Sequence, residues 1–187
     1  MRKILFIIFM LATSLSSMAQ GELKDGVWEE KQVVQAEGVT APTLYLRALE
    51  ALSDWAGSQE KSKIGIDVQD KDEGLVVYKG ELFLGFEYYS KFAGAGWDCF
   101  ANFTMKVKCK DGRAQISVMV PSMTFKANVA GSVVTRPINE FLPDYSYKGD
   151  YKLKKMAPMA HKIEPSFEGI IKKIGEQIAN GTNDDDF

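Results

Sequence analysis

The strongest constraint on this chain is a run of alternating side chains that is interrupted once, by an Asp-Gly pair. Apolar side chains fill every second position on both sides of that pair: Cys99, Ala101, Phe103, Met105, Val107 and Cys109, then Ala114, Ile116, Val118 and Val120. Polar residues, among them Lys106, Lys108 and Lys110, lie between them. Asp111-Gly112 is a typical two-residue hairpin turn. The pattern predicts an antiparallel hairpin with one buried face and one solvated face.

The pattern of the remaining residues predicts further strands of the same sheet and two helices. Alternation predicts three further strands, at residues 27–36, 64–68 and 76–86. A helix is predicted to begin at Thr40-Ala41-Pro42, with the Thr40 hydroxyl as its cap, and to end at Gly57. A last helix is predicted from near Pro165 to Asn180. The expected fold is α+β, in the order β-α-β-β-β-β-α, with both helices packed on one face of one antiparallel sheet.

The two cysteines belong to the same predicted strand. Ten residues of strand separate their Cα atoms by roughly 33 Å, whereas a disulfide needs Cα atoms within about 7 Å. We therefore expect Cys99 and Cys109 to be buried free thiols.

The first nineteen residues have the order of a secretory signal. Arg2 and Lys3 precede a short apolar run, and small residues precede a cleavage site near Ala19. The apolar run is about half of the roughly 20 residues that span a bilayer, so no transmembrane anchor is expected. The sequence therefore predicts export, with a periplasmic or secreted location.

Residues 20–187 are expected to form a single domain. Residues 122–160 contain several prolines and are predicted to be a long irregular connection. Residues 182–187 are predicted to be an acidic tail. Loss of Arg2 and Lys3 from the 23 basic side chains leaves 21 against 25 acidic ones, a net charge of −4. This balance argues against a nucleic-acid partner, because such proteins carry a basic surface.

No set of residues in the sequence is typical of a catalyst. His161 is the only histidine, and no G-x-S-x-G motif supplies a partner nucleophile. One histidine and two separated cysteines do not make a zinc site. The Gly94-Ala95-Gly96 stretch is not followed by the helix that a phosphate-binding loop needs. The acidic residues of the 70–73 turn are expected to be solvated, whereas acid–base catalysis needs carboxyl groups whose surroundings shift their pKa values apart. We expect no catalytic residues, no metal and no cofactor, and hence no enzyme.

Aromatic side chains gather in one segment. Phe86 and four more rings, at Tyr88, Tyr89, Phe92 and Trp97, fall in and around a predicted loop over residues 87–97. Aromatic loops are favoured places for recognition, so these last four residues are the candidate binding site. The alternative is that the rings cover the open end of the core.

The chain resembles exported bacterial proteins that carry a domain of unknown function with a TBP-like fold. The resemblance runs from Val33 to about Val120 and returns weakly in the last helix. The residues that carry it are Gly38-Val39-Thr40, Leu44-Tyr45-Leu46-Arg47-Ala48, Trp55, the acidic turn with Gly74, Phe103-Thr104-Met105-Lys106-Val107 and Lys110-Asp111-Gly112-Arg113. It implies the β-α-β4-α order and no activity.

These observations favour a non-enzymatic exported binding or interaction module of the cell envelope. Its partner is expected to be a protein, a glycan or an amphipathic ligand. Two alternatives stay open: a carboxylate-based hydrolase of envelope polymers, and a carrier that holds an apolar small molecule between the sheet and the last helix.

Overall fold

The computed structural model describes residues 21–129 and 131–181, so the predicted signal peptide and the predicted acidic tail lie outside the described residues. Within that range, seven strands form one antiparallel sheet in the order β1-β2-β6-β5-β4-β3, with β7 also paired to β6. The strands are β1 (Glu22–Lys24), β2 (Val27–Gln35), β3 (Lys63–Asp70), β4 (Leu75–Ser90), β5 (Ala95–Lys110), β6 (Arg113–Ala127) and β7 (Val133–Pro137). The helical segments are α1 (Ala41–Gly57), η1 (Ile138–Glu140), α2 (Tyr151–Met156), η2 (Ala157–Lys162) and α3 (Ile163–Asn180).

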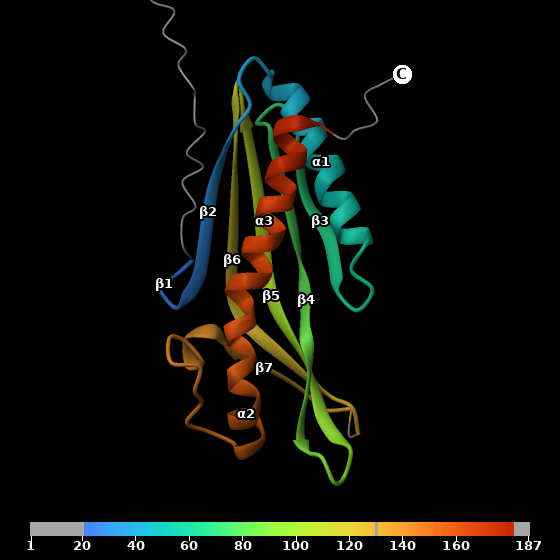
Figure 1. The fold of residues 1–187 in the computed structure, drawn as a ribbon, viewed down its shortest axis with the longest axis vertical. Coiled ribbons are helices and arrows are strands. Elements are labelled where there is room, and N and C mark those ends of the chain that lie inside the picture. The colour runs from blue at the N-terminus through green and yellow to red at the C-terminus, as the bar shows by residue number, and fades with distance from the viewer. Residues whose placement is uncertain (1–20, 130, 182–187) are drawn as a thin grey trace, which may run out of the picture.

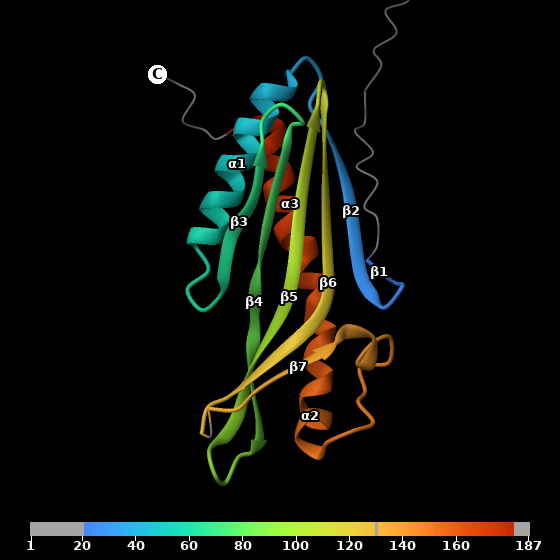
Figure 2. The same ribbon diagram turned by 180° about the vertical axis from the view of Figure 1, so that it is seen from behind.

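The long helices α1 and α3 lie side by side on one face of the sheet, and the other face is open (Figure 1 and Figure 2). A row of rings joins the two layers. The ring of Phe103 in β5 lies 5.7 Å from Trp55 of α1 and 5.4 Å from Phe167 of α3, and Phe167 lies 5.8 Å from Trp28 of β2. The predicted α+β fold, with both helices on one face, is confirmed.

The two faces of the β5–β6 hairpin have the predicted environments. Lys106, Lys108 and Lys110 are exposed on the open face. Cys99 and Cys109 are buried beneath the helices as free thiols, as expected. The register pairs Lys110 with Arg113, so the turn lies at Asp111-Gly112.

A break at Pro121 divides the sheet into two parts. The edge partner of β6 changes there, because β2 pairs with β6 as far as Val120 and β7 pairs with it from Ser122. Pro121 has no N–H to offer to either partner. The β5–β6 register also shifts between Asn102 and Thr104, which is a bulge that bends the ribbon. Beyond the break, β4, β5, β6 and β7 form a separate distal part of the sheet.

Residues 122–160 are more regular than the sequence predicts. They contain the end of β6, then β7, η1, α2 and part of η2. The described residues of this segment that lack helix or strand are 128–129 and 131–132, between β6 and β7, and 141–150, between η1 and α2. The bulge at Pro121 shifts the alternation by one position, which hides the continuation of β6. Helix α2 has six residues, too few for a helical period to be visible in the sequence.

The first turn of α1 is capped by the hairpin and not by Thr40. The Thr40 hydroxyl bonds to the Thr43 hydroxyl at 3.0 Å, and its side chain caps no backbone N–H. Instead, the backbone N–H of Ala41 donates to Asp111 Oδ1 at 2.7 Å. Asp111 therefore both shapes the β5–β6 turn and satisfies an N–H at the start of α1, 70 residues away in the sequence.

One carboxyl group is buried between β2 and α3. Glu30 is 7% exposed, and its Oε2 atom has no hydrogen-bond partner among the described residues. Burial, together with repulsion from the nearby Glu168 and Glu164 of α3, raises the pKa of Glu30 to about 7. The folded protein thus favours the neutral, protonated form of the Glu30 carboxyl group.

Replacing Asp111 with alanine is expected to destabilise the fold by about 1 kcal/mol, the usual loss for a helix cap. D111N keeps the side-chain oxygen and suits the same turn, so it is expected to retain most of that stability. Urea unfolding measures both variants. Equal stability of D111A and the wild type would show that the bond to Ala41 contributes nothing.

Stability is also expected to fall as the pH rises from about 4.5 to about 7. The folded state raises the pKa of Glu30, so it favours the proton, and that contribution disappears as Glu30 ionises. The loss is about 1–3 kcal/mol, and E30Q is expected to remove it and to be the more stable protein at pH 8. The control is E29Q, on the opposite face of β2; thermal unfolding across pH should leave its profile like that of the wild type.

Candidate binding surface at the distal end

The β4–β5 hairpin extends beyond the rest of the sheet. Strands β4 and β5 have sixteen residues each, whereas β2 and β3 have nine and eight. The predicted loop over residues 87–97 is therefore mostly strand, and the turn occupies residues 91–94. Tyrosine and tryptophan favour strands, which explains the difference.

Two of the four candidate residues belong to the core side of this hairpin. Trp97 is buried at 5% exposure, and its ring centroid lies 6.2 Å from that of the half-buried Tyr89. Helix α2 contacts the same ring, because Lys152 Nζ lies 5.1 Å from the Tyr89 centroid. These two rings cover the end of the core, which is the alternative that the sequence left open.

The other two candidates are exposed. Tyr88 is 44% exposed and lies edge-on against Phe86, with centroids 4.7 Å apart. Phe86 itself covers Gly96, where a Cβ atom would lie 2.4 Å from the Phe86 ring. Phe92 lies in the turn and is fully exposed. The structure therefore divides the predicted site between a buried pair and an exposed pair.

The β6–β7 turn lies beside the β4–β5 turn and adds exposed apolar side chains. Asn128 joins them: its Oδ1 accepts from Gly96 N at 2.9 Å, and its Nδ2 donates to the carbonyl of Gly94 at 2.9 Å. Val129 and Val133, on either side of this turn, are 65% and 61% exposed. Both fall in the segment predicted to be irregular, where no periodic pattern indicated them.

Helix α2 completes the same end of the molecule. Tyr151 is exposed at its start, with Lys155 Nζ 5.0 Å from the ring centroid. The same ammonium group donates to the carbonyl of Tyr89 at 3.3 Å, which ties α2 to β4. We call the surface made by Tyr88, Phe92, Val129, Val133 and Tyr151 the distal tip.

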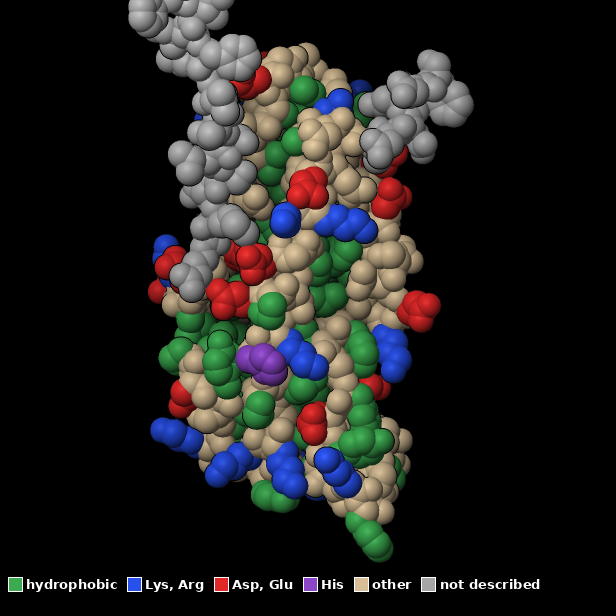
Figure 3. Space-filling model, in the orientation of Figure 1, with side chains coloured by type: hydrophobic (Ala, Val, Ile, Leu, Met, Phe, Trp, Pro, Cys, Tyr) green, Lys and Arg blue, Asp and Glu red, His purple; other side chains and the backbone are tan. Residues whose placement is uncertain are grey.

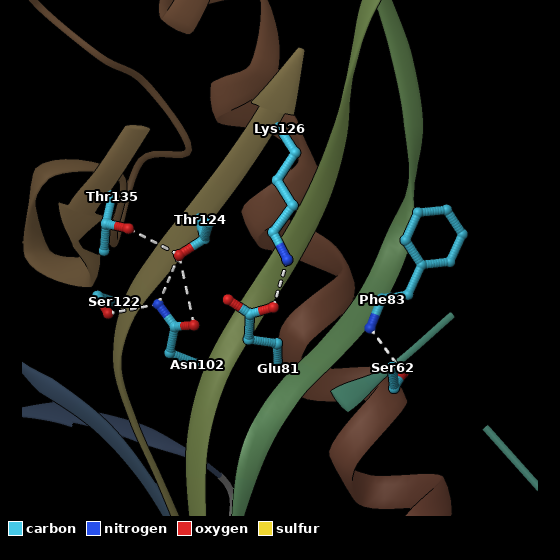
Figure 4. Close-up of polar contacts among 8 residues, drawn as sticks. All are labelled: Ser62, Glu81, Phe83, Asn102, Ser122, Thr124, Lys126 and Thr135. Atoms are coloured by element: carbon cyan, nitrogen blue, oxygen red, sulfur yellow. Dashed lines mark hydrogen bonds and ion pairs between the residues drawn. The ribbon is translucent and has the colours of Figure 1, made fainter. Parts of the chain in front are cut away.

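A polar seam on the open face holds the strands that carry the tip (Figure 4). Asn102 Nδ2 donates to Ser122 Oγ at 2.8 Å and to Thr124 Oγ1 at 2.9 Å, and Thr124 bonds to Thr135 of β7 at 2.8 Å. Lys126 pairs with Glu81 across β5. Because these groups satisfy one another, the seam acts as a support for β7 and is not a free ligand site.

The reactive side chains outside the tip include two buried thiols and one exposed imidazole. Burial raises the pKa of Cys99 to about 12 and that of Cys109 to about 11, so both stay protonated thiols. His161 is exposed in η2, and its Nδ1 contacts the carbonyl of Pro158. Among the described residues, no three metal-ligating side chains come together.

Three cavities of the described structure lie away from the tip. The largest, about 510 Å³, is formed by residues 139–149. A second, about 340 Å³, lies on the open face beside Lys108, Lys110 and Arg113. The third, about 110 Å³, lies near Trp28. The distal tip is thus a projecting surface and not part of these cavities.

Comparison with known proteins identifies relatives of the fold. A family model described as a domain of unknown function (DUF4468) with TBP-like fold matches residues 31–123. A DUF4468 family protein from Bacteroides ovatus is similar in structure, with a TM-score of 0.59 and 13% identity, over 88% of this chain and 92% of that one. A TBP-like protein from Parabacteroides distasonis has the same TM-score and identity, over 85% and 97%. No curated protein matches significantly. No helix within the described residues is long and apolar enough to cross a membrane.

Replacing one buried ring and one exposed ring is expected to change the stability of the protein by different amounts. W97A is expected to cost about 3 kcal/mol or more, because it leaves a cavity in the core. F92S removes an exposed ring and is expected to change stability by less than about 0.5 kcal/mol. Chemical unfolding of both variants tests the division, and a large loss in F92S would place its ring in the core.

Proposed function

Because this chain belongs to DUF4468, the family of domains of unknown function with a TBP-like fold, we propose its function from the geometry of its own surface. It is a non-enzymatic, exported binding module of the cell envelope, and the distal tip is its contact surface. The observation that carries this proposal is the fully exposed ring of Phe92, at the end of a supported hairpin.

The tip differs from the scattered apolar residues of an ordinary surface. A single exposed apolar side chain needs no explanation, whereas several at one end of a molecule are grounds for proposing an interaction site. Here the β4–β5 hairpin, the β6–β7 hairpin and α2 lie at the same end, and each carries at least one exposed apolar side chain (Figure 1). Asn128 bonds to Gly94 in the β4–β5 turn and to Gly96 at the start of β5, so this side of the turn has little conformational entropy left to lose when a partner binds.

The two alternatives have less support. A hydrolase needs two carboxyl groups that face one substrate cavity. Glu30 has the raised pKa of a general acid, but it is buried and does not line the three cavities described above. A carrier needs an apolar cavity between the sheet and α3. The α3 side chains that face the sheet are instead closely packed, and Phe167 and Ile174 have no exposed surface.

Site-specific photo-crosslinking in envelope preparations tests the proposal. A benzophenone amino acid replaces Phe92, and the control places it at Leu46, an apolar residue of α1 that is 58% exposed. We expect an adduct from position 92 and none from position 46, because only the tip contacts a partner. Equal labelling at both positions, or none at position 92, would contradict a contact role for the tip.

A further inference from the structure

We propose that the distal tip docks on the surface of an anionic lipid bilayer, with Phe92 among the acyl chains and nearby lysines at the headgroups. This inference rests on the proposed function and names the partner of the same surface. It concerns a peripheral contact, in which the protein lies on the membrane without spanning it.

Cationic side chains gather immediately beside the apolar tip. Figure 3 shows a row of basic side chains along the end of the molecule that carries α2, next to hydrophobic side chains that project beyond it. Helix α2 supplies three lysines within six residues, and the β4–β5 turn supplies one more: Lys152, Lys154, Lys155 and Lys91. All four are exposed in a chain whose net charge is −2.

These lysines keep their charge available for an external partner. Within the described residues, none of the four forms an ion pair with a carboxylate. Lys152 and Lys155 lie against the rings of Tyr89 and Tyr151, contacts that orient an ammonium group without neutralising it. Asp150, the acid adjoining α2, is engaged by the helix itself, because its Oδ1 accepts from the backbone N–H of Lys152 at 2.8 Å.

The order of these groups fits the layers of a bilayer interface. Phe92 lies in the turn at the end of the hairpin, so it meets a surface first, and Val129 and Val133 flank it from the adjoining turn. Aromatic rings favour the membrane interface, and lysines beside them reach anionic headgroups. A neutral glycan has no negative charge to offer these four lysines, none of which has a carboxylate partner within the described residues, so charge complementarity favours the anionic bilayer.

The expected affinities follow from the two kinds of contact. A lysine near an anionic membrane strengthens binding about fivefold, so loss of three lysines weakens it about a hundredfold. Loss of an inserted phenylalanine weakens binding by roughly ten- to a hundredfold. Because salt screens only the charges, 0.5 M NaCl is expected to remove most of the effect of the lysines and little of the effect of Phe92.

Vesicle co-sedimentation with the protein purified after export is the direct test. The vesicles contain phosphatidylcholine alone or with 30% phosphatidylglycerol. K152Q/K154Q/K155Q is expected to bind the anionic vesicles about a hundredfold more weakly than the wild type. The matched control, K106Q/K108Q/K110Q, removes the same charge from the open face near the other end of β5 and is expected to bind within twofold of the wild type. The binding of F92S to the same vesicles is compared with that of L46S, which removes an exposed apolar side chain of α1.

A fluorophore reports where the tip lies. In F92C, the introduced thiol is the accessible one to which an environment-sensitive dye is attached, because Cys99 and Cys109 are buried. The emission of this dye is expected to shift to the blue on anionic vesicles, whereas the emission of the same dye attached at L46C is not. Equal binding of the two triple variants, or equal binding to neutral and anionic vesicles, would overturn lipid docking. An adduct between position 92 and a protein, without vesicle binding, would overturn the lipid partner and leave the contact role intact. Absence of both would overturn the two proposals together.

Discussion

The burial of one face of β5 and β6 under α1 and α3 is the interaction on which the rest of the structure depends. Each fully buried aliphatic or aromatic side chain on that face contributes about 1.5–3 kcal/mol, while the whole fold of a domain is stable by only about 5–15 kcal/mol. Slipping the register by one residue would place Lys106 and Lys108 beneath the helices. The register of the ribbon is therefore fixed, and with it the position of Asp111 at the start of α1.

The same ribbon carries the candidate contact surface away from the helices. At Pro121 the edge of β6 passes from β2 to β7, and the bulge opposite Phe103 bends the strands. The helices stabilise the part of the sheet before this break. Beyond it, the polar seam around Thr124 and the bridge made by Asn128 hold the hairpins together. This arrangement gives the tip a supported base while Phe92, in the turn at its end, is fully exposed.

The sequence predicted well those features that depend on a regular period. The alternation through Phe103 and Met105 located the central hairpin and its solvated face, and the spacing of the cysteines predicted the free thiols that the structure confirms. The candidate site was predicted only in part. Tyr88 and Tyr89 are neighbours in the sequence, but adjacent strand residues point to opposite faces, so one ring is exposed and the other packs on the core. Val129 and Tyr151 reach the same surface by tertiary packing, which no local pattern records.

The sequence by itself determined the central hairpin, the two long helices and the side of the sheet that they cover, because burying every apolar side chain of these elements leaves one arrangement. Tertiary structure alone decided three other matters. It placed Asp111 where the helix cap was expected from Thr40, and it formed β7 and α2 from a segment without a visible period. It also brought two turns and one helix, far apart in the sequence, to the same end of the molecule. Each of these depends on contacts between residues far apart in the chain, and such contacts leave no periodic signal in the sequence.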